Sequence, residues 1–278
     1  MLIVSSDLVS FDLTAVKALI FDLDGVIWRG QSPIPGASDS VARLRAAGHH
    51  CLFATNNSTR LPEFFSDKLG TMGIKTGPET IVTSSTATAT YLSRQFPSGF
   101  SAYVVGEEGI ANVLRNIGAR VVDETEAIEK VDCVVVGIDR GFNYAKLQRA
   151  QQFLLRGARF IATNRDATFP IEGGVTPGAG SIVASVATAA GMEPLSMGKP
   201  EPAMLLTILE EHGLEKHQAA MIGDRLDTDI ACAHRAGIGA LFVATGVTPM
   251  HTAQEASGEL RPHLFYEDLP ALCAALDI

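Results

Sequence analysis

Short apolar runs alternate with helix-patterned segments along most of this chain of 278 residues. The runs of strand length are ALIF, HCLFAT, AYVVG, DCVVVG, RFIATN, AAMIGD and ALFVAT, at residues 18–21, 50–55, 102–106, 132–137, 159–164, 219–224 and 240–245. Helical patterns lie between them, for example at residues 38–47, 145–155 and 202–212. Strands that alternate with helices favour parallel sheets joined by right-handed crossovers, so the sequence predicts an α/β protein.

Composition and charge argue against several classes of protein. The length of 278 residues suggests one large or two moderate domains, and a hydrophobic content of 46% provides an ample core. The net charge of -9, without a cluster of Lys and Arg, argues against nucleic acid and anionic membranes as partners. The apolar runs are too short to span a bilayer and the first residues lack signal-peptide features, so we expect a cytoplasmic protein.

The first apolar run ends in two aspartates and a glycine, within KALIFDLDGVIW at residues 17–28. Side chains alternate along a strand, so Asp22 and Asp24 would lie on one side where the sheet stops, and Gly25 permits a sharp change of backbone direction. Two crowded carboxylates suit a hard divalent cation, and Mg²⁺ is the simplest candidate. A solvated Asp-Gly turn is the alternative, and this fragment alone does not separate the two.

Polar residues also end or follow other predicted strands. Thr55 ends the second run and Asn56 follows it, whereas Asp224 ends AAMIGD and Asp229 follows that run. In addition, Lys199 stands just before a predicted helix. Ligands of open α/β sheets bind at the carboxyl ends of strands, so these side chains should gather there. Carboxylates for a metal, donors for an oxyanion and one ammonium suit phosphoryl transfer, and a carboxylate can itself attack phosphorus.

Four segments resemble, in order, the four motifs of the haloacid dehalogenase (HAD) superfamily. They are DLDGV, TNNS, GKPEP and GDRLDTDI, at residues 22–26, 55–58, 198–202 and 223–230. Between the second and third motifs, VVVGIDRGFNYAKLQRA, ATNRDATFP and TPGAGSIVASV resemble the α/β cap of the para-nitrophenylphosphatase-like subclass IIA. The resemblance implies a Rossmann-like parallel-sheet core at residues 1–97 and 193–278, with an inserted α/β cap domain at 98–192.

The same resemblance implies a Mg²⁺-dependent phosphatase that forms an aspartyl-phosphate intermediate. Expected substrates are small phosphomonoesters: para-nitrophenyl phosphate, phosphoglycolate, glycerol phosphate, and sugar or nucleotide monophosphates. A phosphomutase or phosphotransferase is one alternative, a pyridoxal phosphate phosphatase another, and an inactive phosphate-ligand sensor is the non-enzymatic alternative. Members of the family often pair through their caps, so a homodimer is a further expectation.

Catalytic and metal-binding roles follow from matching the motifs. Asp22 matches the nucleophile, and Asp24 matches the acid and base that protonates the leaving oxygen and then activates water. The metal ligands would be Asp22, Asp224 and the backbone carbonyl of Asp24. Asp229 matches a residue that orients metal-bound water or Lys199.

Phosphate binding is assigned in the same way. The hydroxyl of Thr55 and the backbone N–H of Asn56 match the groups that donate to phosphate oxygens. Lys199 would neutralise the phosphate and hold Asp22 ionised. Turn capping is the alternative for Thr55 and Asn56, and an isolated lysine is usually a solvated surface residue.

Substrate selection would fall to the cap, because the core groups contact only phosphate. Asn164, Arg165, Asp166 and Phe169 lie on a stretch that resembles the specificity loop of the family. Arg165 has three open interpretations: it meets an acidic part of the substrate, pairs with Asp166 or faces water. Phe169 stands where pyridoxal phosphate-directed relatives have a histidine, which weakens that alternative. Trp28, just after the first motif, is expected to pack in the core.

Overall fold

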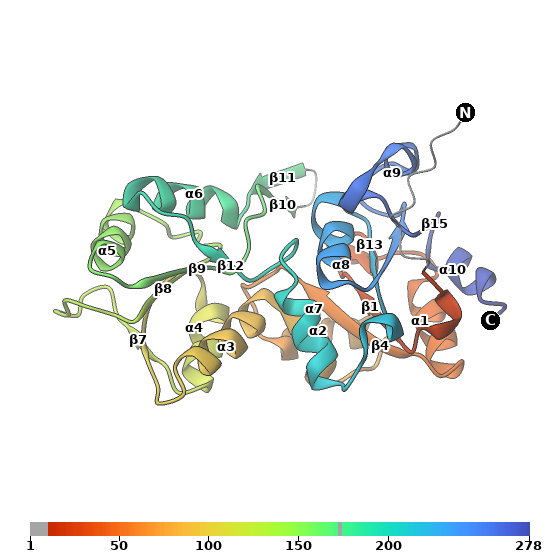
Figure 1. Ribbon diagram of the computed structural model, residues 1–278, viewed down its shortest axis with the longest axis horizontal. Coiled ribbons are helices and arrows are strands. Elements are labelled where there is room, and N and C mark those ends of the chain that lie inside the picture. Colours follow the sequence, from red (N-terminus) through yellow and green to blue (C-terminus); the bar gives the residue numbers. More distant parts are fainter. Residues whose placement is uncertain (1–10, 172–173) are drawn as a thin grey trace.

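The computed structural model of the chain describes residues 11–171 and 174–278. Its two lobes lie side by side, and each is built around one parallel sheet with helices packed against it (Figure 1). The predicted α/β class is confirmed. Within the described residues, no helix is both long and apolar enough to cross a bilayer.

The first lobe contains a six-stranded sheet in the order β15-β14-β13-β1-β4-β5. Its strands are β1 (Ala18–Phe21), β4 (His50–Thr55), β5 (Ile81–Thr83), β13 (Ala219–Gly223), β14 (Gly239–Val243) and β15 (Leu264–Tyr266). The helices of this part of the chain are α1 (Ala37–Ala46), α2 (Pro62–Thr71), α3 (Ser84–Gln95), α7 (Ala203–Glu211), α8 (Ala231–Ala236), α9 (Met250–Glu255) and α10 (Leu269–Ala275). All neighbouring strands run parallel, so their carboxyl ends share one edge.

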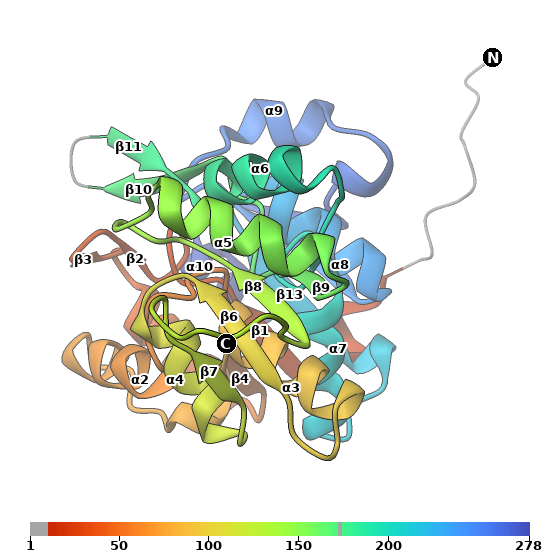
Figure 2. The same ribbon diagram turned by 90° about the vertical axis from the view of Figure 1, so that its left-hand side faces the viewer.

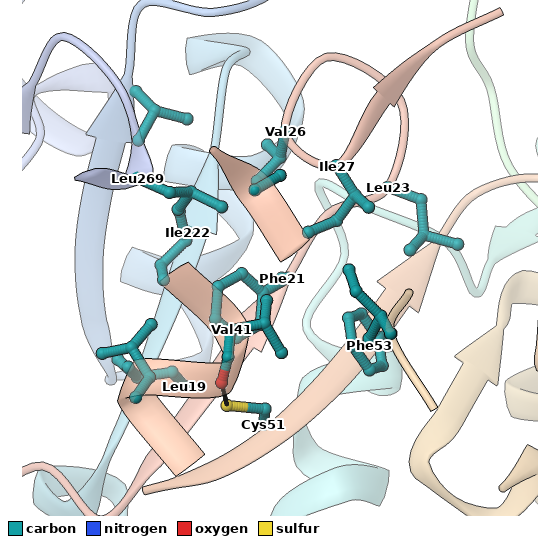
Figure 3. Packing of buried hydrophobic residues seen from close by; sticks show 14 of the residues in the cluster. Leu19, Phe21, Leu23, Val26, Ile27, Val41, Cys51, Phe53, Ile222 and Leu269 are labelled. Carbon is teal, nitrogen blue, oxygen red and sulfur yellow. Dashed lines mark hydrogen bonds between the residues drawn. The ribbon is translucent and has the colours of Figure 1, made fainter. Parts of the chain in front are cut away.

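Alternate residues of β1 enter two hydrophobic cores on opposite faces of this sheet. Leu19 and Phe21 pack with residues of α1 and α10, whereas Ala18 and Ile20 pack with residues of α7 and α8. Figure 3 shows the first core, in which the thiol of Cys51 donates to the carbonyl of Val41 in α1 at 4.0 Å. Burial on both faces explains why β1 is apolar throughout and shows no alternation.

The second lobe contains a five-stranded parallel sheet in the order β12-β9-β8-β6-β7. Its strands are β6 (Ser101–Val105), β7 (Arg120–Val122), β8 (Cys133–Val136), β9 (Arg159–Ala162) and β12 (Leu195–Ser196), and its helices are α4 (Glu108–Asn116), α5 (Tyr144–Leu155) and α6 (Ala179–Ala190). Helices α5 and α6 cover one face, and α3 and α4 cover the other (Figure 2). Helix α3 covers a face of this sheet and β12 is one of its strands, although both lie outside residues 98–192. The expected domain limits stay a prediction.

Two short hairpins lie outside the two parallel sheets. β2 (Trp28–Arg29) pairs with β3 (Ser32–Pro33) directly after the first motif. β10 (Thr168–Ile171) pairs with β11 (Gly174–Pro177) in the region expected to form the specificity loop. A π-helical turn at Leu226–Ile230 carries the last motif into α8. Neither hairpin is apparent from apolar runs, because its strands have only two or four residues and contain no uninterrupted apolar run.

Candidate active site

The carboxyl ends of three adjacent strands bring the expected core residues together. Strand β1 lies between β13 and β4, and all three run parallel. Asp22 directly follows β1, Thr55 ends β4 and Asp224 directly follows β13. The backbone N–H of Asp22 continues the sheet by donating to the carbonyl of Ile222 at 2.9 Å. The side chains of Asp22, Thr55 and Asp224 are all buried at this edge.

Lys199 lies at the centre of this group. Its Nζ donates to Asp22 Oδ1 at 2.6 Å, to Asp229 Oδ1 at 2.7 Å and to the carbonyl of Ala54 at 3.2 Å. Only 2% of the residue is exposed, so these bonds replace contacts with water. Burial lowers the pKa of this ammonium, but the carboxylates of Asp22 and Asp229 outweigh burial and hold the pKa above its ordinary value. Lys199 therefore stays charged.

Three buried carboxylates surround this one ammonium. Asp22, Asp224 and Asp229 each offer an oxygen, and these oxygens lie within 4.8 Å of one another. Burial raises the pKa of Asp224 to about 7, helped by the charge of Asp229. Asp224 Oδ2 accepts the N–H of Val247 at 2.6 Å, whereas its buried Oδ1 has no hydrogen-bond partner among the described residues.

This arrangement fits a divalent cation with oxygen ligands. Burial raises the pKa of Asp22 well above its usual range, and the charges of Asp229 and Asp224 add to that rise while Lys199 opposes it. A single ammonium cannot balance three ionised carboxylates in a buried site. Mg²⁺ prefers carboxylate oxygens, and Asp224 Oδ1 offers a free one.

The carboxylate of Asp24 lies outside this acidic cluster. Its Oδ1 accepts a hydrogen bond of 2.9 Å from the indole Nε1 of Trp28. Burial raises the pKa of Asp24, and the bond from Trp28 and the charge of Lys68 oppose that rise. Trp28 is 1% exposed and belongs to the first core, as expected, but its bond to Asp24 is not evident from the sequence.

A loop after β14 also contributes to the site and was not anticipated. The Thr245 hydroxyl donates to the carbonyl of Gly25 at 2.6 Å, and the Val247 N–H donates to Asp224 as described. Gly25 has φ +89°, and a Cβ there would lie 2.6 Å from Asp224 Cγ. The run ALFVAT contained the available signal, since β14 neighbours β13 and its carboxyl end reaches the same edge.

Asn56 connects the two lobes. Its Oδ1 accepts the backbone N–H of Lys199 at 2.8 Å, and its Nδ2 donates to the carbonyl of Lys199 at 2.9 Å. The same Nδ2 lies 3.1 Å from both carboxylate oxygens of Asp166 in the second lobe. Thr55 Oγ1 accepts the N–H of Asn57 at 3.1 Å, which is the turn-capping contact considered from the sequence.

The structure separates the other expected cap residues. Asn164 is buried and donates from Nδ2 to the carbonyl of Asn56 at 2.8 Å. The half-exposed Arg165 instead pairs with Glu193 at 2.9 Å. Phe169 is half-buried within β10. Asn164 therefore joins Asp166 beside the core residues, whereas Arg165 forms its ion pair within the second lobe.

Comparison with known proteins identifies the family. The sequence profile of the haloacid dehalogenase-like hydrolases matches residues 19–120, and a HAD-hydrolase-like profile matches residues 196–272. The acid sugar phosphatase of Staphylococcus aureus (strain USA300) is 38% identical over 261 residues, which cover 94% of this chain and 98% of the relative. The chain belongs to the haloacid dehalogenase-like hydrolases.

Solved structures resemble this HAD-like hydrolase over both lobes. The 4-nitrophenylphosphatase of Thermotoga maritima has a TM-score of 0.86 at 31% identity, covering 94% of this chain and 98% of that one. The glycerol phosphate phosphatase of Mycobacterium tuberculosis, solved with magnesium, has a TM-score of 0.86 at 35% identity, covering 93% of this chain and 77% of that one. The resemblance to subclass IIA predicted from the motifs is confirmed.

Proposed function

We propose that this HAD-like hydrolase is a Mg²⁺-dependent phosphatase of small phosphomonoesters. The contact of Lys199 with both Asp22 and Asp229, beside Asp224, carries the proposal because it gathers the groups that phosphoryl transfer requires. The relatives support the same activity, since they are named for acid sugar, 4-nitrophenyl and glycerol phosphates. Sugar, glycerol and aryl phosphates are therefore the first substrates to test.

The proposed reaction passes through phosphorylated Asp22. A carboxylate oxygen of Asp22 attacks phosphorus, the bond from phosphorus to the leaving oxygen breaks, and Asp24 gives that oxygen a proton. Water then attacks the phosphorus of the aspartyl phosphate and gives a proton to Asp24, while the bond between phosphorus and the Asp22 oxygen breaks. This second step releases inorganic phosphate and restores both carboxyl groups.

The surrounding groups hold the phosphate and balance its charge. Lys199, the Thr55 hydroxyl and the backbone N–H of Asn56 are the proposed phosphate-binding groups. Asp22, Asp224 and the backbone carbonyl of Asp24 would hold Mg²⁺, which neutralises charge and polarises a phosphoryl oxygen when bound.

Asp229 has a supporting role in this proposal. Its Oδ1 accepts a hydrogen bond from Lys199, and its Oδ2 accepts the backbone N–H of Arg225 at 3.1 Å. Both oxygens of Asp229 are therefore engaged by neighbouring groups of the chain. This leaves the unpartnered oxygen of Asp224 as the better protein ligand for a cation.

The second lobe supplies the proposed selection among leaving groups. Asn164 and Asp166 are the best-placed candidates, because both bond to Asn56. Arg165 and Phe169 stay in the proposal as residues of the same loop. We also propose a cytoplasmic enzyme that pairs through its cap. We propose that it binds neither nucleic acid nor membranes, and the net charge of -9 supports this last point.

Phosphate release from a panel of phosphomonoesters, with and without Mg²⁺, tests the proposal. Asp22→Asn should reduce turnover at least about a thousandfold, because an amide is a poor nucleophile towards phosphorus. Asp67→Asn, at an exposed position of α2, is the matched control and should keep full activity. Undiminished turnover by a pure Asp22→Asn preparation would refute the assignment. Incorporation of labelled water into the released phosphate distinguishes hydrolysis from transfer to another alcohol.

A further inference from the structure

Trp28 makes a polar contact that core packing does not require. It is the only tryptophan of the chain and is 1% exposed. Its indole Nε1 donates to Asp24 Oδ1 at 2.9 Å, although the ring belongs to the same hydrophobic core as Phe65. A buried indole N–H needs an acceptor, and here the acceptor is the carboxyl group assigned to proton transfer.

The backbone fixes the indole relative to Asp24. The Trp28 N–H donates to the carbonyl of Leu23 at 3.1 Å, and the Gly25 N–H donates to the carbonyl of Trp28 at 2.7 Å. These bonds close a tight loop between Asp24 and Trp28, so neither residue can shift without the other. The loop therefore holds Trp28 and Asp24 close together at the end of β1.

A cation from α2 lies over one face of the same ring. Lys68 Nζ lies 3.9 Å from the centroid of the Trp28 ring and donates to the carbonyl of Gly30 at 2.8 Å. The quadrupole of an indole ring attracts a cation that lies over its face at this distance. Lys68 thus connects α2 to Trp28 and to the turn of the β2–β3 hairpin.

We propose that Trp28 is a positioning residue for Asp24 and that Lys68 stabilises Trp28 in this role. An indole N–H can only donate, so Oδ1 of Asp24 is engaged as an acceptor and Oδ2 is left to exchange a proton with the leaving oxygen. The inference rests on the proposed phosphatase function. It assigns a task within that reaction to a residue outside the catalytic groups.

Leaving-group dependence distinguishes positioning from packing. An alkyl phosphate such as glycerol phosphate expels a basic alkoxide and needs a proton from Asp24, whereas 4-nitrophenolate leaves without one. The constant kcat/KM covers only the steps up to the phosphorylated enzyme, so the shared hydrolysis step does not enter it. Loss of Asp24 positioning should therefore reduce kcat/KM for the alkyl ester far more than for the aryl ester.

The test variant is Trp28→Phe, which keeps an aromatic ring but removes the N–H donor. We expect kcat/KM for glycerol phosphate to fall about tenfold or more and that for 4-nitrophenyl phosphate to fall less than about threefold, within the range of general acid catalysis. Phe65→Leu, in the same core, is the matched control and should change kcat/KM for both substrates by the same factor. Equal losses for Trp28→Phe, or no loss, would overturn the proposal.

Lys68 variants keep the inference testable if Trp28→Phe fails to fold. Lys68→Met removes the cation but leaves the donor, and should give a smaller loss with the same preference for the alkyl ester. Lys68→Arg keeps a cation and should restore the wild-type ratio of the two substrates. An unchanged ratio in Lys68→Met would contradict the role of Lys68 and, without a folded Trp28→Phe, the proposal. Wild-type activity in Asp22→Asn would instead refute the phosphatase assignment, whatever Trp28 does.

Discussion

At Gly25, backbone conformation and the geometry of the site constrain each other. Its φ of +89° lies in the left-handed region, and a Cβ there would lie 2.6 Å from Asp224 Cγ. A side chain would therefore strain the loop after β1 and also displace a carboxylate of the acidic cluster. The glycine allows the Asp24 loop and the end of β13 to lie in contact.

Gly25→Ala should lower both stability and activity. We expect the free energy of unfolding to fall by more than about 1 kcal/mol, because the positive φ and the contact with Asp224 both oppose the methyl group. Urea unfolding and phosphate release measure the two effects. Gly30→Ala is the control, because φ there is also positive, at +58°, but no atom lies within 4 Å of the added carbon. If both variants kept full activity, the close approach of Gly25 to Asp224 would not be needed for phosphate release.

Individual residues differ in how far the sequence could predict them. Asp22, Thr55 and Asp224 end apolar runs, so the rule that ligands bind at strand ends was enough to bring them together. Lys199 was assigned only through its motif, because its partner Asp22 lies 177 residues away and nothing local indicates that the lysine is buried. The bond from Trp28 to Asp24 spans an irregular loop, where no periodicity predicts which side chains meet.

At the scale of elements, two histidines join helix α8 to the end of the core sheet. His234 of α8 lies with its ring centroid 4.7 Å from that of His263, which precedes β15. The backbone N–H of Ala240 in β14 donates to His263 Nδ1 at 2.9 Å. That nitrogen must be unprotonated to accept the bond, so the contact requires a neutral His263.

This contact should make stability depend on pH. Burial, aided by the nearby His234, lowers the pKa of His263 to about 4, below the value of about 6.5 in an unfolded chain. The unfolded state therefore binds the proton more readily. The stabilisation is complete above pH of about 6.5 and is lost as the pH falls towards about 4. His263→Asn keeps an acceptor but cannot titrate, so it should show a shallower loss of stability over that range.

Urea midpoints at several pH values between 7 and 4, for wild type and variant, measure the difference. His217→Asn, at an exposed position, is the control and should follow the wild-type slope. A His263→Asn variant with the full wild-type slope would show that other groups cause the pH dependence.

The principal strands were predictable because both sheets are covered on both faces. Burial produces uninterrupted apolar runs, and the runs at 18–21 and 50–55 coincide with β1 and β4. Strands β5, β7, β12 and β15 were not anticipated, since each has only two or three residues and lies at or near a sheet edge. So short a strand carries too little pattern to distinguish it from a loop.

At the scale of the whole molecule, specific polar contacts join the two lobes. Asn56 bonds to Lys199 in the core and to Asp166 in the second lobe. The order of the motifs predicted an insertion between Thr55 and Lys199. It did not predict which side chains join the inserted lobe to the core, because such contacts depend on how the two lobes are oriented.

The acidic cluster should make the stability of the whole chain depend on divalent cations. A cation that binds the folded state at one hundred times its Kd adds about 2.7 kcal/mol to the free energy of unfolding. For a chain of this size that corresponds to a rise in Tm of several degrees. We therefore expect Mg²⁺ to raise the wild-type Tm and a chelator to reverse the rise.

Asp224→Asn should abolish this dependence, since it removes the carboxylate whose Oδ1 is buried without a partner among the described residues. Without metal, the variant should be at least as stable as wild type, because burial disfavours the charge of Asp224 and raises its pKa to about 7. Asp227→Asn is the control: this exposed carboxylate of the same motif pairs with Arg225 at 3.1 Å. It should keep the full response to Mg²⁺, whereas an equal response in Asp224→Asn would exclude Asp224 as a ligand. Because Tm reports binding without turnover, the result separates loss of the cation from loss of chemistry.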